Sequence, residues 1–258
     1  QASPRQLAVF DDRFVKGLAR IAAAVHRFPS GVFLQIAHAG RQTKAKLCGS
    51  TPVAPSAVYD PVSKVMPREL EPVEIEALVR DFVEAARRAR ESGFDGVQLH
   101  VAHGYLLSSF LSPHTNRRTD AWGGPLENRV RVVVEIVRGV RSLLGRGFPV
   151  IVKLNSTDFL DGGLTVDESV RAAVILEQAG IDGVEVSGGM AEAGRGSIWP
   201  GLRKPEDEGY FVEAAAKVKA AVNVPVLGLG GIRSLEVAEE FVREGRVDIV
   251  SMSRPFIR

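Results

Sequence analysis

The chain has 258 residues, 45% of them hydrophobic and 25% charged, which is enough to bury the core of one large domain. Its 33 Lys and Arg nearly balance its 31 Asp and Glu, so the net charge of +2 gives no reason to expect nucleic acid or an anionic membrane as partner. Cys48 is the single cysteine, which excludes an intrachain disulfide framework, and no apolar run reaches the roughly 20 residues that span a bilayer. We therefore expect a soluble, cytoplasmic protein that acts on a small molecule and has no metal site. The oligomeric state stays open, and a homo-oligomer is one of the alternatives.

Short β-branched runs alternate with longer amphipathic segments along the chain, which is typical of repeated βα units around a parallel sheet. A helix is predicted over Asp11–Arg27, before the first strand. The predicted strands are Val32–Ala37, Val97–Val101, Val150–Leu154, Gly183–Ser187, Val224–Leu229 and Asp248–Met252. The helices predicted between them are 74–91, 125–144, 167–179, 208–221 and 234–244. Long polar connections, 38–73 and 102–124, are predicted after the first two strands.

Two architectures have strands and helices in this order: an open doubly wound sheet, and an eight-strand barrel of which part is missing. No Gly-x-Gly-x-x-Gly motif follows the first strand, which weakens the dinucleotide-binding alternative. The chain also begins with a helix and stops just past a strand, as a trimmed barrel would. We therefore predict an α/β fold, a (β/α)8 TIM barrel that is incomplete here, with about six parallel strands and their helices.

Two histidines and a tyrosine follow the second predicted strand within six residues, in His100-Val-Ala-His103-Gly-Tyr105. Paired imidazoles can donate hydrogen bonds to a developing oxyanion, and a phenol can donate a proton in the transition state. A lone histidine at a strand end more often has a structural partner. The clustering of three such groups favours a catalytic site.

Glycines follow the fifth predicted strand in Gly228-Leu-Gly-Gly-Ile-Arg-Ser234, and Ser251-Met-Ser-Arg254 follows the sixth. Backbone amides before a helix start bind phosphate, and barrels often hold a phosphate after their last strands. Arg254 can add a bidentate contact. The alternative is an ordinary tight turn beside a surface arginine.

Lys153 interrupts the apolar strand Val150–Leu154, where an ammonium is costly without an anionic partner. Asp158 or a neighbouring carboxylate is one candidate partner. An electron-rich bound ring, or a Schiff base formed with a carbonyl substrate, is the other. Gln35 is likewise a polar residue among apolar neighbours near the end of a strand.

Several motifs in this order resemble the old yellow enzyme family of FMN-dependent oxidoreductases: Gln35-Ile-Ala-His-Ala-Gly-Arg41, His100-Val-Ala-His-Gly-Tyr105 and Phe110-Leu-Ser-Pro-His-Thr-Asn-Arg-Arg-Thr-Asp-Ala-Trp-Gly-Gly124. The resemblance continues through Glu127-Asn-Arg129, the strand with Lys153 and the Gly-Gly-Ile loop. Each motif alone is weak, but the ordered set is specific. It implies an eight-strand barrel that binds FMN and accepts electrons from NAD(P)H.

Carried over by position, the resemblance implies a role for each site residue. His100 and His103 would hydrogen-bond a carbonyl or nitro oxygen of the substrate, and Tyr105 would donate a proton. Gln35 would bind the flavin ring and Lys153 would lie beside its N1–C2 edge, where a cation stabilises the reduced flavin. The FMN phosphate would be held by Gly230, Gly231, Ser253 and Arg254.

The activity implied is the NAD(P)H-dependent reduction of an activated carbon–carbon double bond, such as that of an α,β-unsaturated carbonyl compound. The family's first two strands and C-terminal tail have no counterpart, so residues 1–258 are expected to be a single FMN-binding barrel domain truncated at both ends. Two alternatives stay open. One is a Schiff-base aldolase or decarboxylase that uses Lys153, and the other is a barrel that binds flavin without catalysis.

Overall fold

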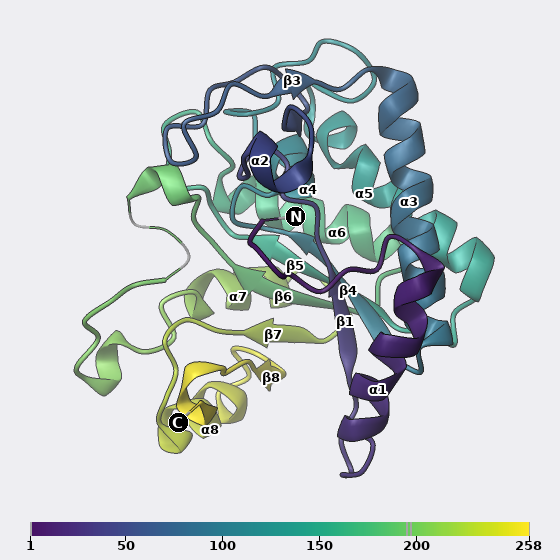
Figure 1. The fold of residues 1–258 in the computed structure, drawn as a ribbon. Coiled ribbons are helices and arrows are strands. Elements are labelled where there is room, and N and C mark those ends of the chain that lie inside the picture. The colour runs from purple at the N-terminus through teal and green to yellow at the C-terminus, as the bar shows by residue number, and fades with distance from the viewer. Residues whose placement is uncertain (1, 195, 197, 258) are drawn as a thin grey trace.

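The computed structural model describes residues 2–194, 196 and 198–257. Its main sheet has six strands in the order β1-β4-β5-β6-β7-β8, and each pair of neighbours is parallel (Figure 1). These strands are β1 (Phe33–Ile36), β4 (Gly96–Val101), β5 (Val150–Asn155), β6 (Gly183–Ser187), β7 (Val226–Gly228) and β8 (Ile249–Val250). A second sheet pairs β2 (Val53–Ala54) with β3 (Arg68–Glu69).

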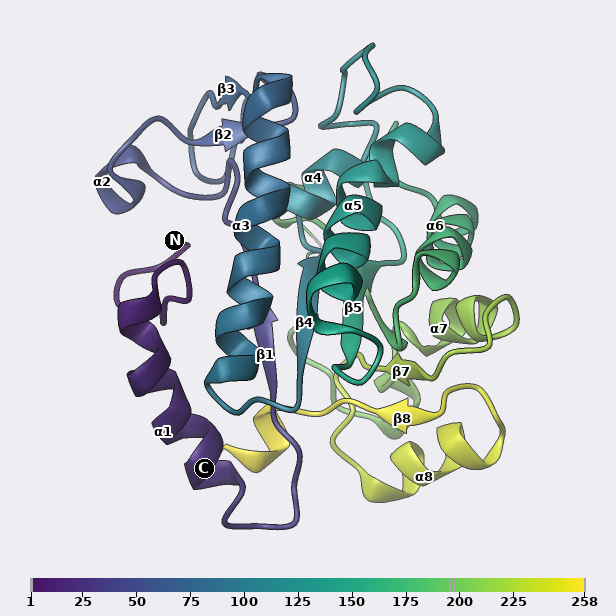
Figure 2. The same cartoon turned by 90° about the vertical axis from the view of Figure 1, so that its right-hand side faces the viewer.

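Helices precede and separate the strands, and the longest of them cover the outer face of the curved sheet (Figure 2). They are α1 (Val15–Val25), α2 (Ala45–Cys48), α3 (Pro72–Glu91), α4 (Leu106–Leu111), α5 (Leu126–Leu144), α6 (Val166–Ala179), α7 (Val212–Lys219) and α8 (Leu235–Arg243). Short 3-10 turns occur at Asp12–Phe14, Ala191–Ala193, Pro205–Asp207 and Arg254–Phe256. No helix among the described residues is both long and apolar enough to cross a membrane.

Local sequence explains where the long helices begin and end. Thr165 caps α6 through a reciprocal pair of hydrogen bonds with Glu168, and Gly180, at φ +107°, ends the helix in a left-handed conformation. Helix α3 has the same reciprocal arrangement between Glu71 and Glu74, with Pro72 as its first residue.

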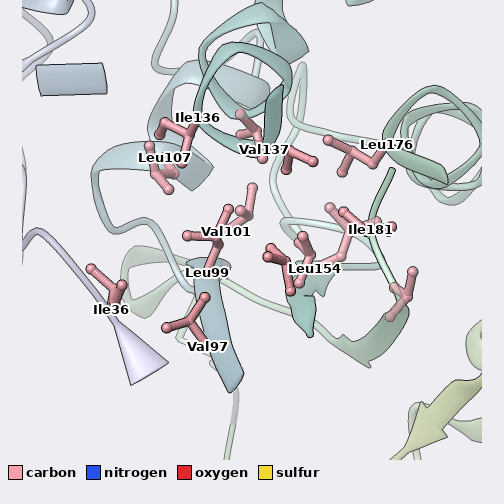
Figure 3. Packing of buried hydrophobic residues seen from close by; sticks show 14 of the residues in the cluster. Ile36, Val97, Leu99, Val101, Leu107, Ile136, Val137, Leu154, Leu176 and Ile181 are labelled. Carbon is pink, nitrogen blue, oxygen red and sulfur yellow. The ribbon is translucent and has the colours of Figure 1, made fainter. Parts of the chain in front are cut away.

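Alternation along the strands separates an apolar face from a polar one. The side chains between the sheet and the helices are fully buried and form the core. Leu99 on β4, Leu154 on β5 and Leu176 on α6 are examples (Figure 3). The opposite face carries Gln98, Lys153 and Glu185, and Lys153 pairs across the strands with His100 on β4 and with Glu185 on β6. This polar face is the interior of the barrel, and it holds the candidate site.

The predicted incomplete barrel is confirmed. Strands that are consecutive in the chain are neighbours in the sheet, whereas a doubly wound sheet reverses its strand order part-way. The outer strands are shorter than predicted. Helix α7 begins at Val212 instead of at 208, because Gly209 takes φ +72° and its amide donates to the carbonyl of Gly230.

The connection 102–124 was predicted as polar, and this is wrong for its first half. Residues 106–111 form α4, and every side chain of this helix is buried. Helix α2 and the small sheet of β2 and β3 likewise lie inside the predicted connection 38–73. Segments of two to six residues are too short to show a helical or alternating period.

Candidate active site

The three clustered residues lie together where β4 leads into α4. The imidazole of His100 meets the ring of His103 edge-on, with centroids 5.0 Å apart, and meets the ring of Tyr105 edge-on at 4.9 Å. His100 belongs to β4, His103 lies in the turn, and Tyr105 is the residue before α4. The structure therefore brings together the predicted trio.

Burial keeps both imidazoles neutral. Burial, with a smaller contribution from the nearby charge of Lys153, lowers the pKa of His100 to about 4. Burial, followed by the influence of His100 and Lys153, lowers the pKa of His103 to about 3. Two neutral imidazoles can donate hydrogen bonds without adding positive charge to the site.

His103 sits in a strained turn that its neighbours fix. Its φ of +65° is uncommon for a residue other than glycine. Its backbone amide donates to Oδ1 of Asn155 at 3.0 Å, and its carbonyl accepts from Nε2 of Gln42 at 2.7 Å. Its Nε2 lies 2.7 Å from Oγ of Ser187, on β6. Asn155 and Gln42 thus hold the backbone of this turn, and Ser187 contacts the imidazole itself.

A row of polar side chains crosses the interior of the barrel from β1 to β6. Nε2 of Gln35 donates to Oε1 of Gln98 at 2.6 Å, and Nε2 of Gln98 donates to Oε2 of Glu185 at 2.8 Å. The same Oε2 lies 3.1 Å from Nζ of Lys153. Gln35 and Lys153, predicted on different strands, are thereby joined through two residues that the sequence analysis did not select.

The carboxylate partner expected for Lys153 is therefore Glu185, a neighbouring carboxylate, and not Asp158. Asp158 is fully buried and accepts hydrogen bonds from the Asn155 side chain and the Leu164 amide. Burial raises the pKa of Asp158, although these hydrogen bonds act to lower it.

A cavity of about 720 Å³ opens beside this row, a volume within the usual range of small-molecule sites. Its wall includes His103, Lys153, Glu185 and Ser187 from the central strands. The loops after β7 and β8 complete it with Gly230, Gly231, Ser253 and Arg254. Of the trio, only His103 is in the wall of this cavity.

Both glycines of the loop after β7 are needed for close packing. Gly230 has φ +130°, and a Cβ there would lie 2.8 Å from the amide nitrogen of Tyr210. Gly231 has φ +69°, and a Cβ there would lie 2.2 Å from Cδ1 of Leu202. Both conformations are uncommon for residues other than glycine.

The start of α8, in contrast, is already occupied by a carboxylate. Glu208, whose side chain is 1% exposed, accepts hydrogen bonds from the amides of Arg233 and Ser234 and from the Ser234 hydroxyl. Burial opposes its ionisation, but these hydrogen bonds prevail and lower the pKa of Glu208 to about 2. The amides of Arg233 and Ser234 are therefore already engaged, and the predicted phosphate site relies on the amides of the two loops before this helix and after β8.

The sequence model of the NADH:flavin oxidoreductase / NADH oxidase family matches residues 1–258. The chain belongs to this family. An NADH oxidase from Thermoanaerobacter brockii is 41% identical over 98% of the chain and 38% of that protein. An NADPH dehydrogenase from a Geobacillus species is 36% identical over 99% of the chain and 72% of that protein. A solved 2-naphthoyl-CoA reductase superposes with a TM-score of 0.87 at 34% identity, covering 97% of the chain and 40% of that structure.

The chain thus spans less than half the length of that NADH oxidase. Family membership confirms the resemblance and the enzyme class, because members are oxidoreductases that use FMN with NAD(P)H as electron donor. The described residues fit a flavin nucleotide. Nδ1 of His100 is buried with no hydrogen-bond partner among them, and the amides of Gly231 and Ser253 donate to no protein acceptor in this part of the chain.

Sequence reasoning missed Gln98, Asn155, Glu185 and Ser187. A signal was present, since Glu185 and Ser187 alternate with valines along β6 and must share the face opposite to them. Arg118 is buried and joins Asp120, at 2.6 Å, to backbone carbonyls, which is a structural role in the loop.

Proposed function

We propose that the protein reduces activated carbon–carbon double bonds with NAD(P)H as donor and FMN as cofactor. The observation that carries this proposal is that the neutral imidazole of His100 packs edge-on against both His103 and Tyr105, beside a cavity lined by Lys153 and by the glycine loop after β7. FMN, when bound, would supply the hydride for this reduction.

His100 and His103 hold the carbonyl or nitro oxygen of the substrate through hydrogen bonds from neutral imidazoles. This draws electron density from the double bond and stabilises negative charge that develops on the oxygen. Tyr105 then donates a proton to the α-carbon, so that a hydride and a proton add across the bond. Asn155 and Ser187 keep His103 in its strained orientation.

Residues 1–258 act as one FMN-binding unit in this proposal. Gln35 would contact the flavin ring and Lys153 would lie beside it. The phosphate is held by Gly230, Gly231, Ser253 and Arg254, three of which are partly or fully exposed at the cavity wall. The activating group need not be a ketone, since a related solved structure is a 2-naphthoyl-CoA reductase, an enzyme named for a thioester.

A Schiff-base mechanism is less well supported. An amine that is ion-paired with Glu185 at 3.1 Å is held as an ammonium, which has no lone pair for attack on a carbonyl. Trapping with borohydride in the presence of a carbonyl substrate would label Lys153 if this alternative were correct.

The test of the proposal is the visible spectrum of the whole protein, followed by anaerobic titration with NADH or NADPH and then with a simple enone. We expect a flavin spectrum that the nicotinamide bleaches and the enone restores. A protein that binds no added FMN would refute the proposal. Flavin that binds but is not bleached would instead support the non-catalytic alternative.

A further inference from the structure

Glu185 is the carboxylate at the centre of the polar row inside the barrel. It lies on β6 directly opposite Lys153 on β5, and its side chain is 9% exposed. One carboxylate oxygen, Oε2, is ion-paired with Nζ of Lys153 and accepts a hydrogen bond from Nε2 of Gln98. Because Gln98 is itself held by Gln35, the position of this oxygen is fixed from two sides.

This arrangement changes the charge that Lys153 presents to the cavity. Lys153 and Glu185 both line its wall, so a bound molecule meets the ammonium and the carboxylate together. In a partly desolvated site the field of a lone cation is strong, whereas that of a close ion pair falls off much faster with distance. A ring beside Lys153 therefore experiences much less than one full positive charge.

We propose that Glu185 is a positioning residue that holds Lys153 in place, offsets its charge, and thereby keeps the reduction potential of the flavin low. This inference rests on the proposed function, since it requires FMN beside Lys153. Reduction adds electrons to the ring, and an uncompensated cation favours the reduced form. Lys153 without Glu185 would make the flavin easier to reduce and a weaker hydride donor.

The experiment uses the whole protein with FMN bound and measures the midpoint potential against a redox dye. Glu185→Gln keeps the size of the side chain and an oxygen that accepts from Gln98, but removes the negative charge. We expect the ratio of reduced to oxidised flavin at a fixed dye potential to rise at least tenfold, which is about 30 mV for a two-electron couple. Glu127→Gln is the matched control, because Glu127 is an exposed residue of α5 paired with Arg171, and it should leave the potential unchanged.

A second pair of variants covers the case in which Glu185→Gln does not fold. Lys153→Met alone leaves Glu185 as an unpaired charge and should lower the ratio at least tenfold. The double variant Lys153→Met/Glu185→Gln removes both charges, a replacement that proteins commonly tolerate, and should return the ratio to within about threefold of the wild type.

The possible results separate the two claims. Bound FMN with the same potential in the wild type and Glu185→Gln would overturn the inference and leave the proposed function intact. A double variant as low as Lys153→Met alone would overturn it in the same way. A whole protein with no flavin spectrum would overturn both.

Discussion

The central strands and the outer strands of the sheet differ in how firmly they hold their side chains. Strand β6 is buried at every position, and β4 is buried at all but one. On the outer strands, Phe33 of β1 is 40% exposed and Ile249 of β8 is 48% exposed. The difference matters because the predicted chemistry is divided between these regions.

The residues proposed to bind substrate and transfer the proton lie on or next to the central strands, where ring contacts join the three and hydrogen bonds fix His103. The residues proposed to bind the cofactor lie partly on the outer strands and loops, and Gln35, Ser253 and Arg254 are exposed. We infer that substitutions near the centre change the reaction, whereas those at the edges change cofactor affinity.

Tyr105→Phe is the substitution with the largest expected effect. It removes the proposed proton donor but keeps the ring that packs against His100, so re-oxidation of the flavin by an enone should slow by roughly 10²–10⁴. Reduction of the flavin by NAD(P)H should be unaffected. Stopped-flow measurement of the two half-reactions distinguishes these effects.

The matched control is Tyr59→Phe, since Tyr59 is a tyrosine 47% exposed outside the cavity wall. Equal slowing of both half-reactions by Tyr105→Phe would assign Tyr105 a general structural role. No slowing of the enone half-reaction would show that the proton comes from elsewhere.

Much of the fold was predictable because its signals are periodic. Helices α3, α5 and α6 carry apolar stripes over 14 residues or more, and their predicted bounds are within two residues of the observed ones. The short α4 was missed because its six residues are all buried and show no alternation. The late start of α7 was missed because it depends on Gly209 contacting Gly230, a residue distant in the sequence.

The candidate site was predictable only where the functional residues are adjacent in the sequence. His100, His103 and Tyr105 lie within six residues, so their cluster is visible without a structure. Glu185 meets Lys153 only through the pairing of β5 with β6, and Glu208 occupies the start of α8 from across a loop. Contacts of this kind are set by tertiary packing and leave only a weak trace in the local sequence.

Stability should depend on pH through the buried pair at the centre. His100 and His103 have pKa values lowered to about 4 and about 3, so their contribution is complete above the usual histidine value and is lost as the pH falls toward these values. At pH 5 a histidine that is protonated only when unfolded lowers the free energy of unfolding by about 2 kcal/mol. Urea denaturation at pH 7.5 and pH 5 measures the loss.

Other groups titrate in the same range, so the comparison needs a variant. His100→Gln should lose less stability between the two pH values than the wild type does, by about the contribution of one histidine. Identical losses in both proteins would mean that His100 is not held neutral by burial.

Arg254→Met should have the smallest of these effects, because Arg254 is exposed at the edge of the cavity. Loss of one charge-assisted contact to a phosphate should weaken FMN binding by roughly tenfold, or about 1.4 kcal/mol. The deficit should shrink at high salt, where exposed charges are screened.

Arg243→Met is the control, since Arg243 is an exposed residue in the last turn of α8 that does not line this cavity. Fluorescence titration with FMN gives both affinities. Equal FMN affinity of Arg254→Met and the wild type at low salt would place the phosphate elsewhere. A loss far above tenfold would show that Arg254 is held as rigidly as the residues of the central strands.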